Sequence, residues 1–559
     1  MHRFLMPLVL FGLLILCHCG REPAPTEAST APDAKVETPD HLRIGMLVRP
    51  DSTNPYLTMR RSGMTIVYLL YPKLFKELPN LVDGVPDLQP FLVKQATWDE
   101  AGTTVTLLLR DDLTWSDGTP ITTADVAYSF EAQRNEAVAW MGFDETRRVA
   151  DWKVTSPQAL QVTFKERSLF NMLSLNEGFI VPKHRFETVP WETWLEHDWT
   201  QNPVVYGPYL FDGAPNDEGM RLVARDPEAA RIDRLDFAFI RDKEALYQLL
   251  LAGELDYSWS LPTPRIADVH AKLHSYFYND FSMAYLAWNP LDPEAYAAAN
   301  PKEKAALDTL KAERPHRLFG DARVRRAMTL LMDRNGYNQR LWAGQAGVPL
   351  SPWRAGLPYL ATKGEPEPHD PKKATELLTA AGWAKRDGVW TLDGEPVRFT
   401  VVCNAGSPIR ENVLLAVQQD LAKEGIDMQI DLTEPSRYLQ MGAERRFDAA
   451  FAMLATGSRP DVDGFFNSEA ALGGAGNWSS WTAVDDHLQA AAKAADATTL
   501  TNAMAALEAA FIEDQPVSLL FAGRGVAAMT PDSDVVPRSC YLSPLFEVDQ
   551  WRPRAGGSP

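Results

Sequence analysis

Cysteine is scarce in this chain of 559 residues. Only four are present, and two of them, Cys17 and Cys19, stand near the N-terminus. The other two, Cys403 and Cys540, are so far apart in the sequence that nothing indicates a bridge, although export to an oxidising compartment would permit one. We therefore expect two separate thiols, partly or fully buried.

Motifs of common enzyme classes are missing as well. The chain has no H-E-x-x-H, no G-x-S-x-G, no P-loop and no G-x-G-x-x-G, so it carries no local signature of a zinc protease, an α/β-hydrolase or a nucleotide-binding enzyme. Its ten histidines are scattered without the paired spacing of metal ligands. The sequence predicts a protein that is not an enzyme and has no cofactor and no metal site.

Long apolar runs and net positive charge are also absent. Beyond the N-terminus no run approaches the roughly eighteen apolar residues of a membrane-spanning helix. The net charge of −19 opposes binding to nucleic acid or to an anionic membrane surface. With 45% hydrophobic and 23% charged residues, the composition is that of a globular chain long enough for two or three domains.

The N-terminus has the layout of a secretory signal. A short basic start precedes an apolar run over residues 4–16, which ends in Cys17-His18-Cys19. We predict export, with Cys19 as the lipid attachment site because the polar segment begins directly after it. Cys17 is the alternative anchor, and a plain signal peptide cleaved a few residues later is another alternative. Residues 20–41 are rich in Pro, Ala, Thr and Glu, and are predicted to form a disordered tether.

Residues 103–130, TTVTLLLRDDLTWSDGTPITTADVAYSF, predict a strand, a tight turn and a capped helix. The first eight residues are β-branched and apolar, as in a strand. Asp117-Gly118 favours a turn, because Asp can bond to its own backbone and Gly tolerates positive φ. Thr122 and Asp125 have the spacing of a capping box, so a helix should begin there. We expect these residues to shape the turn and the cap rather than to bind anything.

The ordered combination L-R-x-x-L-x-W-S-D-G-x-P-(x)3-A-D-V-x-Y-S-F resembles the signature of the family 5 extracellular solute-binding proteins, the receptors of bacterial ABC importers. Further matches follow in the family's order up to the C-terminus: Gly207-Pro208-Tyr209, Gly253-Glu254-Leu255-Asp256, residues 285–289 (YLAWN), residues 320–327 (GDARVRRA) and residues 370–383 (DPKKATELLTAAGW). The arginines at 323, 325 and 326 are expected to form structural ion pairs.

Periodicity and turn residues predict further elements. Helices are expected at residues 64–75, 244–252, 370–382 and 502–511, with an exposed helical insertion over 293–315; strands are expected at 42–48, 232–240 and 516–521. Residues 397–432 read as strand, helix and strand, a unit that favours parallel pairing.

The resemblance implies an α/β fold of the periplasmic-binding-protein type: a two-lobe clam with an extra third domain, mixed sheets flanked by helices, and hinge crossovers. The implied ranges are lobe I at residues 42–73, 206–286 and 511–559, an accessory domain at 74–205, and lobe II at 287–510. We use these names for these ranges throughout. Cys403 and Cys540 would then lie in different lobes.

The resemblance also implies the function and the partners. The protein would capture a peptide or peptide-like solute by lobe closure and deliver it to ABC permease subunits. It would act as a monomer in the periplasm or cell envelope, held at the membrane by its lipid anchor. A sensory or scaffold binding protein and a secreted hydrolase are the alternatives.

Peptide receptors of this family hold the peptide's α-ammonium with an Asp in a loop similar to G-D-N-x-D-P-D-x-F-F. The corresponding residues 457–466 read GSRPDVDGFF, so Ser458 stands where that Asp is expected, with Arg459 and Phe465 in the same loop. A hydroxyl cannot replace the charge that a buried ammonium needs. Asp461 or Asp463 takes this role if the loop is shifted; otherwise both cap turns.

Dipeptide receptors also place an Arg after the strand that corresponds to residues 397–402. Here that region carries Asn404, with Arg410 nearby. Because both peptide-end anchors depart from the pattern, a longer peptide, a modified peptide or another small polar solute remains open. The other candidate ligand-binding residues supply aromatic walls and orienting amides: Asn54, Tyr71, Trp288, Asn289, Asn477 and Trp478.

Overall fold

The computed structural model of the protein describes residues 41–553, apart from residues 59, 83–84, 141, 354–356, 358, 361–364, 456–462, 474–475, 532 and 534. The predicted signal, with Cys17 and Cys19, and the predicted tether lie outside the described residues, except that the first strand already begins at His41. No helix of the described part is long and apolar enough to cross a bilayer.

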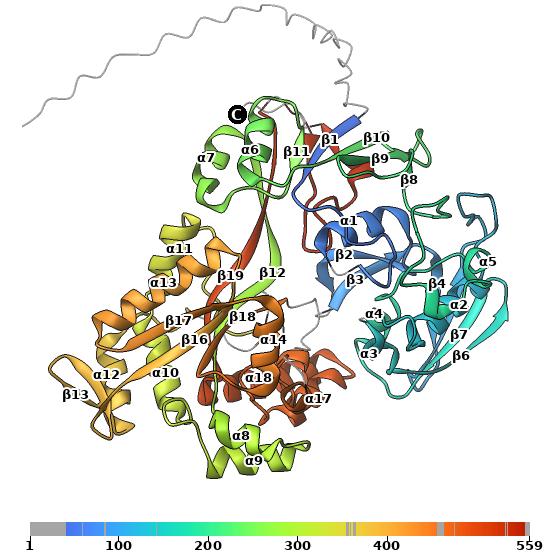
Figure 1. Cartoon of the computed structure of the whole chain (residues 1–559). Coiled ribbons are helices and arrows are strands. Elements are labelled where there is room, and N and C mark those ends of the chain that lie inside the picture. Colours follow the sequence, from blue (N-terminus) through green and yellow to red (C-terminus); the bar gives the residue numbers. More distant parts are fainter. Residues whose placement is uncertain are drawn as a thin grey trace, which may run out of the picture. The chain divides into compact units, whose positions relative to one another are not determined.

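One continuous mixed sheet runs through the described chain. Its strands, in spatial order, are β17 (Asp427–Thr433), β16 (Arg398–Asn404), β18 (Ala449–Ala455), β12 (His274–Trp288), β19 (Val517–Met529), β11 (Tyr257–Ser258), β1 (His41–Met46), β10 (Arg234–Phe239), β9 (Gly219–Ala224) and β8 (Tyr209–Phe211). The long strands β12 and β19 lie side by side and antiparallel at its centre (Figure 1). They join the strands of lobe I to those of lobe II.

The side chains on the two faces of β12 pack into two different hydrophobic cores of lobe II. Ala284, Leu286 and Trp288 pack into a cluster with residues of α10 to α13, whereas Met283, Tyr285 and Ala287 pack with residues of α14, α17 and α18. This follows from the period of two in a strand, which sends successive side chains to opposite faces. The sheet of lobe II is therefore buried on both sides, as parallel sheets generally are. The predicted parallel pairing of residues 397–432 is confirmed, since β16 and β17 are parallel.

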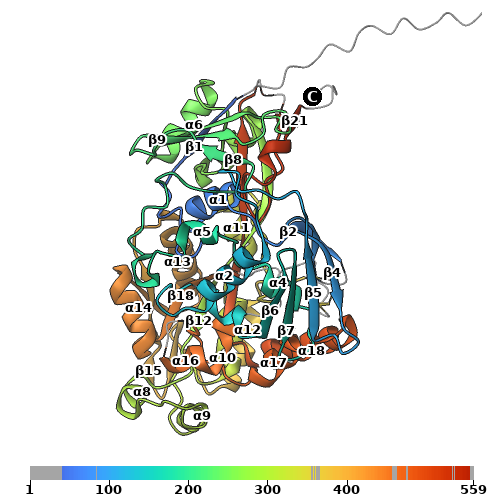
Figure 2. The ribbon, with the colours of Figure 1, turned by 90° about the vertical axis from the view of Figure 1, so that its right-hand side faces the viewer.

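The accessory domain contains a separate antiparallel sheet in the order β4 (Val93–Trp98), β5 (Thr104–Leu109), β7 (Ala159–Phe164) and β6 (Val149–Ser156), with α2 beside it (Figure 2). Val126 and Phe130 of α2 pack onto alternate residues of β5. The shorter pairings are β2 (Phe75–Val82) with β3 (Val85–Pro90), β13 (Ala384–Arg386) with β14 (Val389–Leu392) and β15 (Glu395–Pro396), and β20 (Val535–Val536) with β21 (Arg552–Pro553).

The helices have the following bounds: α1 (Arg61–Leu70), α2 (Thr123–Arg134), α3 (Phe143–Thr146), α4 (Asn171–Leu175), α5 (Lys183–Phe186), α6 (Lys243–Leu251), α7 (Ile266–Lys272), α8 (Pro293–Ala299), α9 (Lys304–Glu313), α10 (Ala322–Leu331), α11 (Arg334–Trp342), α12 (Pro371–Ala380), α13 (Pro408–Lys423), α14 (Pro435–Glu444), α15 (Asp463–Phe466), α16 (Ser468–Gly473), α17 (Asp485–Ala492) and α18 (Ala497–Asp514). The insertion predicted at 293–315 is confirmed as α8 and α9. The helix predicted at 64–75 is wrong at its end: it stops at Leu70, because Tyr71 precedes Pro72 and is extended.

The capping box predicted in the signature segment is confirmed. Thr122 is the N-cap of α2; its side chain accepts from the Ala124 N–H, and its own N–H donates to the Asp125 carboxylate at 2.8 Å. The second carboxylate oxygen of Asp125 accepts from the N–H of Lys183 at 2.9 Å. One buried side chain therefore starts α2 and also fixes the segment that leads into α5.

The signature turn also joins the accessory domain to lobe I. The N–H of Ser116 donates to the Val205 carbonyl at 2.9 Å, and the Val205 N–H donates to the Ser116 hydroxyl at 3.1 Å. Directly afterwards the Gly207 N–H donates to the Leu70 carbonyl, and a Cβ on Gly207 would stand 2.0 Å from the Leu69 carbonyl oxygen. Glycine is required there because the chain passes against the end of α1.

Two of the three arginines of the α10 segment form the expected ion pairs. Arg323 pairs with the N-cap carboxylate of Asp321 at 2.6 Å, and Arg326 pairs with Glu367. Buried Arg325 donates instead to backbone carbonyls, among them those of Asp514 and Gln515 at the end of α18. The two remaining cysteines are also as predicted: Cys403 is a buried free thiol and Cys540 a partly buried one.

The accessory domain contacts lobe II at the C-terminus of α17. The Ala492 carbonyl accepts from the Arg148 guanidinium and from the Ser168 hydroxyl, each at 2.9 Å. Two residues on, the Leu169 N–H donates to the Ala494 carbonyl, also at 2.9 Å. Next to these bonds, Phe170 is buried in the same cluster as residues of α17 and α18. This contact, which we call the α17 contact, joins lobe II to the accessory domain independently of the central strands.

Replacing Asp125 by alanine tests the capping box. Asp125→Ala leaves the N–H groups of Thr122 and Lys183 without their acceptor, so the free energy of unfolding should fall by about 1–3 kcal/mol. Urea denaturation followed by tryptophan fluorescence measures it. Glu131→Ala, at an exposed position of the same helix, is the matched control; an equal loss in both variants would contradict the assignment.

Candidate functional site

A cavity of about 290 Å³ lies at the carboxyl edge of the lobe II strands. Asn404 is the last residue of β16, Met453 lies near the end of β18, and these two strands are parallel, so their carboxyl ends meet at one edge. Open α/β sheets bind ligands at this edge. The cavity is lined by Tyr285, Asn404, Arg410, Tyr438, Leu439, Phe451, Ala452, Met453, Phe465, Gly476 and Trp478.

Among the described residues, a single cation belongs to the lining. Arg410 stands in the first turn of α13, and its guanidinium is held by the side-chain carbonyl of Asn404. The buried Nε of Arg410 has no hydrogen-bond partner among the described residues. A buried donor that the protein leaves unsatisfied is uncommon. The guanidinium can therefore donate to an anionic oxygen from outside the chain, and a carboxylate fits its planar geometry best.

Aromatic rings form the apolar wall. Tyr438 and Trp478 stack with ring centroids 4.4 Å apart, and the Tyr438 hydroxyl donates to the Phe451 carbonyl at 2.9 Å, which fixes the ring. Leu439 and Met453, by contrast, are exposed large apolar side chains, at 54% and 44%. Apolar surface left open beside a cavity with one positive charge suits a ligand that has both an apolar part and an anionic group.

The tyrosines of this cavity and the cysteine next to it hold their protons firmly. Burial raises the pKa values of the Tyr285 and Tyr438 hydroxyls, so both stay neutral. Burial likewise raises the pKa of the adjacent Cys403 thiol to about 11, which makes it a poor nucleophile. No group of three or more His, Cys, Asp or Glu side chains in the described part of the chain could hold a metal ion.

The sequence model of the bacterial extracellular solute-binding proteins, family 5, matches residues 87–477. This chain belongs to that family. The family consists of binding proteins that serve as receptors for solutes, not of enzymes, and the two-lobe fold with mixed sheets that the resemblance implied is confirmed.

Relatives of this family 5 protein are similar along its whole length. The oligopeptide-binding protein AppA of Bacillus subtilis is 22% identical over 567 aligned residues, which cover 98% of this chain and 97% of AppA. Its solved structure with a nonapeptide has a TM-score of 0.71 at 20% identity, covering 92% of this chain and 98% of that one. NikZ of Campylobacter jejuni with Ni(L-His) has a TM-score of 0.72 at 20% identity, covering 92% and 99%. At this identity the solved structures establish the fold alone.

The predicted site residues of the family 5 protein separate into three groups. Asn404, Arg410, Phe465 and Trp478 come from distant parts of the sequence and line the one cavity at the end of β16. Their role in binding stays a prediction. Ser458, Arg459 and Asp461 lie outside the described residues, and Asp463 opens α15 with only its backbone described.

The remaining candidates have structural contacts. Trp288 is buried, and its indole N–H donates to the Ser518 hydroxyl at 2.9 Å. The Asn289 amide donates to the carbonyls of Arg445 and Phe447. The Asn54 amide bonds to the backbone of Tyr56 and Trp194, and that of Asn477 bonds to the backbone around residues 467 and 481. Tyr71 lines a different cavity, in lobe I.

Seven lining residues escape prediction from the sequence: Tyr285, Tyr438, Leu439, Phe451, Ala452, Met453 and Gly476. Tyr285 lies within a quoted family motif but reads as an ordinary strand residue, and the stacking partner Tyr438 belongs to a helix without a motif. Met453 stands in the apolar run of β18. One signal in the sequence does mark this place. A polar residue at the end of a strand in a β-α-β unit lies at the binding edge of a sheet, so the residues that flank β16 and β18 are candidates for the lining.

Replacing Arg410 tests the cavity. Arg410→Ala should weaken binding of a solute with a carboxylate by about tenfold or more, because a charge-assisted hydrogen bond is lost. Solute retained by the purified protein, measured by native mass spectrometry, should fall in proportion. Arg398→Ala removes an arginine from the exposed start of β16, where it pairs with Asp427, and should leave retention unchanged. Equal retention in both variants would remove Arg410 from the site.

Proposed function

We propose that this family 5 protein is the extracytoplasmic receptor of an ABC importer, which captures a peptide or peptide-like solute between its lobes and hands it to a membrane permease. The observation that carries the proposal is the cavity at the carboxyl edge of β16 and β18. It combines one incompletely satisfied guanidinium, Arg410, with a stacked aromatic wall and exposed apolar rims. A peptide carboxylate and an apolar side chain meet these requirements together.

Ser458 bears on the length of the peptide. Since a hydroxyl offers no negative charge to an α-ammonium, the ammonium of a dipeptide has no partner at this position. A longer peptide places its ammonium further from Arg410, and a modified peptide has none to place. Longer or N-blocked peptides are therefore the favoured ligands, in keeping with the nonapeptide bound to AppA.

Capture depends on lobe closure. A cavity with lining from lobe II and β12 alone leaves one side of a bound peptide uncovered, and the opposite lobe must supply the rest. The α17 contact is a second connection to lobe II besides the central strands, and it holds lobe II against the accessory domain when those strands bend.

In the cell the protein acts as a monomer at the outer face of the membrane. It is attached through a lipid on Cys19, or on Cys17.

Two other functions compete with this one. A sensory or scaffold protein would bind the same solute but signal to a partner instead of delivering it. A secreted hydrolase would need a nucleophile or a metal, and the Cys403 thiol, with its raised pKa, does not supply a nucleophile. The receptor is favoured because the family consists of solute-binding proteins.

Native mass spectrometry of the purified protein tests the function directly, because tight receptors retain solute. We expect a small adduct that denaturation releases and that tandem spectrometry identifies as a peptide. A thermal-shift panel of di-, tri- and pentapeptides, with and without N-acetylation, then shows which peptide length and which N-terminus the protein prefers. A ligand that binds only the folded state raises the melting temperature. Cleavage of the panel peptides would favour the hydrolase, and stabilisation by no member would weaken the receptor proposal.

The α17 contact provides a test of closure that does not depend on the site itself. Arg148→Ala with Ser168→Ala removes two hydrogen bonds to the Ala492 carbonyl, so the affinity for the identified peptide should fall by about tenfold. Solution X-ray scattering should show a larger radius of gyration. Arg147→Ala, at the exposed neighbouring position, serves as the control. An unchanged affinity and an unchanged radius of gyration in the double variant would show that the α17 contact takes no part in closure.

A further inference from the structure

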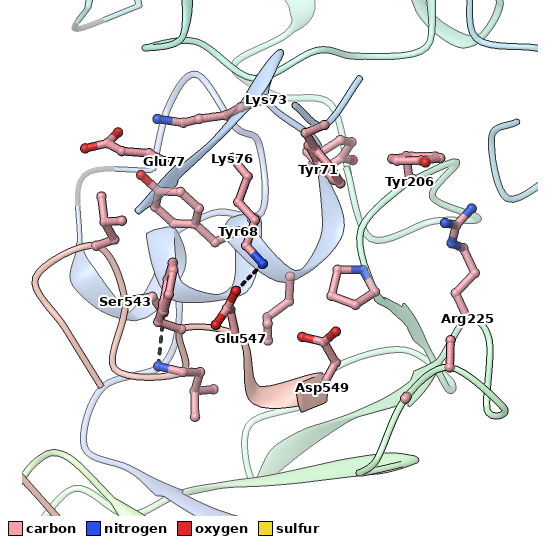
Figure 3. A pocket seen from close by; sticks show the side chains of 18 of the residues that line it. Tyr68, Tyr71, Lys73, Lys76, Glu77, Tyr206, Arg225, Ser543, Glu547 and Asp549 are labelled. Atoms are coloured by element: carbon pink, nitrogen blue, oxygen red, sulfur yellow. Dashed lines mark hydrogen bonds and ion pairs between the residues drawn. The ribbon is translucent and has the colours of Figure 1, made fainter. Parts of the chain in front are cut away.

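A larger cavity, which we call the lobe I cavity, lies between lobe I and the start of the accessory domain and shares no lining residue with the one in lobe II. It measures about 350 Å³, within the range of about 300–1,000 Å³ typical of small-molecule pockets. Its walls come from the end of α1, from β2, from the Gly207 turn, from residues 225–230 and from residues 542–549 (Figure 3). Aromatic rings and charged side chains share the lining, and the rings are those of Tyr68, Tyr71, Phe75, Phe91, Tyr206 and Phe546.

Most charged groups around this cavity are already engaged. Lys76 and Arg538 pair with the Glu547 carboxylate, whose side chain is 10% exposed. Glu77 accepts from the Tyr541 hydroxyl at 3.0 Å. The Asp226 carboxylate accepts from the N–H groups of residues 228 and 229, which it caps.

Buried Lys73 is engaged as well. Its ammonium lies over the rings of Tyr68 and Phe179, at 5.2 and 5.3 Å from their centroids. Burial by itself lowers the pKa of this lysine, but Tyr68, Glu177 and Glu77 outweigh that effect, and the pKa stands above its usual value. Lys73 is thus a fixed cation with its own anionic surroundings.

Two opposite charges are left, Arg225 and Asp549. The Arg225 guanidinium stacks on the Tyr206 ring at 4.4 Å and donates once, to the Thr114 carbonyl at 3.3 Å. The Asp549 carboxylate accepts only from the neutral Gln550 amide, at 3.0 Å. No ion pair joins either group to another residue of the described part of the chain. In Figure 3 the Asp549 carboxylate lies between the Lys76–Glu547 ion pair and Arg225.

We propose that the lobe I cavity is a second binding site, which takes a small zwitterion with an apolar or aromatic side chain: a free α-amino acid. Asp549 accepts from the ligand's ammonium, and Arg225 donates to its carboxylate. The side chain packs against the rings of Tyr71 and Tyr206. A half-buried carboxylate and a half-buried guanidinium on one aromatic cavity match the two charges of such a ligand, whereas a purely anionic or cationic ligand would leave one of them unpaired.

The site is built into the fold on both sides. The Thr114 carbonyl that Arg225 contacts directly precedes the signature turn, and Ser116 of that turn holds Val205, next to Tyr206. Asp549 is fixed from the other side, since its carbonyl accepts from the Arg231 N–H at 2.8 Å. Both charged groups therefore stand on braced backbone, which lowers the entropic cost of binding.

Isothermal titration and thermal shift with L-phenylalanine test this site, with phenylalaninamide and N-acetylphenylalanine as probes that each lack one charge. We expect L-phenylalanine to bind and to raise the melting temperature, and each probe to bind at least about tenfold more weakly. Asp549→Asn and Arg225→Gln should each cause a loss of the same size, and Arg225→Lys a smaller one. Asp233→Asn, at an exposed position of the same lobe, should change nothing.

Arg410→Ala distinguishes the two sites. Binding of L-phenylalanine that persists in Arg410→Ala and is lost in Asp549→Asn and Arg225→Gln supports the second site, whether or not the peptide receptor proposal holds. Binding that is lost in Arg410→Ala and kept in the other two places the amino acid in the lobe II cavity and overturns this proposal alone. Absence of binding to the unsubstituted protein overturns it as well. If Asp549→Asn fails to fold, the variants Arg225→Gln and Arg225→Lys decide between these outcomes.

Discussion

The pairing of β12 with β19 is the constraint on which the rest of the structure depends. These two strands belong to both halves of the sheet: β19 continues into lobe I through β11, and β12 continues into lobe II through β18. Among the described strands, the two halves of this sheet are therefore joined along one antiparallel ribbon. The register of that ribbon shifts between Asn279 and Met283 and again between Ala284 and Tyr285. Such irregularities interrupt the ladder and let a strand bend.

The ribbon also positions the binding edge. Because alternate residues of β12 point to opposite faces, Tyr285 reaches the cavity while its neighbours Ala284 and Leu286 fill the opposite core. A change in the bend of the ribbon would move Tyr285 relative to lobe I but leave Arg410, Asn404 and Tyr438 in place relative to each other. These three residues thus form a preorganised part of the cavity within lobe II.

Local signals in the sequence were sufficient for the elements and insufficient for the site. The cap at Thr122, the Asp370-Pro371 start of α12 and the parallel strands around α13 depend on neighbours in the chain, and all three were predicted correctly. The cavity depends on residues from 285 to 478 meeting at one sheet edge. Asn404 and Arg410 could be proposed because a family pattern marks that position, and Trp478 because of its residue type. Tyr438 could not be predicted, because the sequence pattern of an amphipathic helix assigns such a tyrosine to the hydrophobic core.

The same limit applies to residues that sequence reasoning did select. Trp288 and Asn289 end a strand and look suited to a binding edge, but they stand at the opposite end of the parallel array from Asn404. Trp288 pairs with Ala449 at the start of β18, and β12 runs antiparallel to β18. The direction of a single strand in a mixed sheet decides which of its ends faces the ligand edge, and that direction is a property of the whole topology. Residue type and local pattern therefore select candidates, and only strand direction sorts binding residues from core residues.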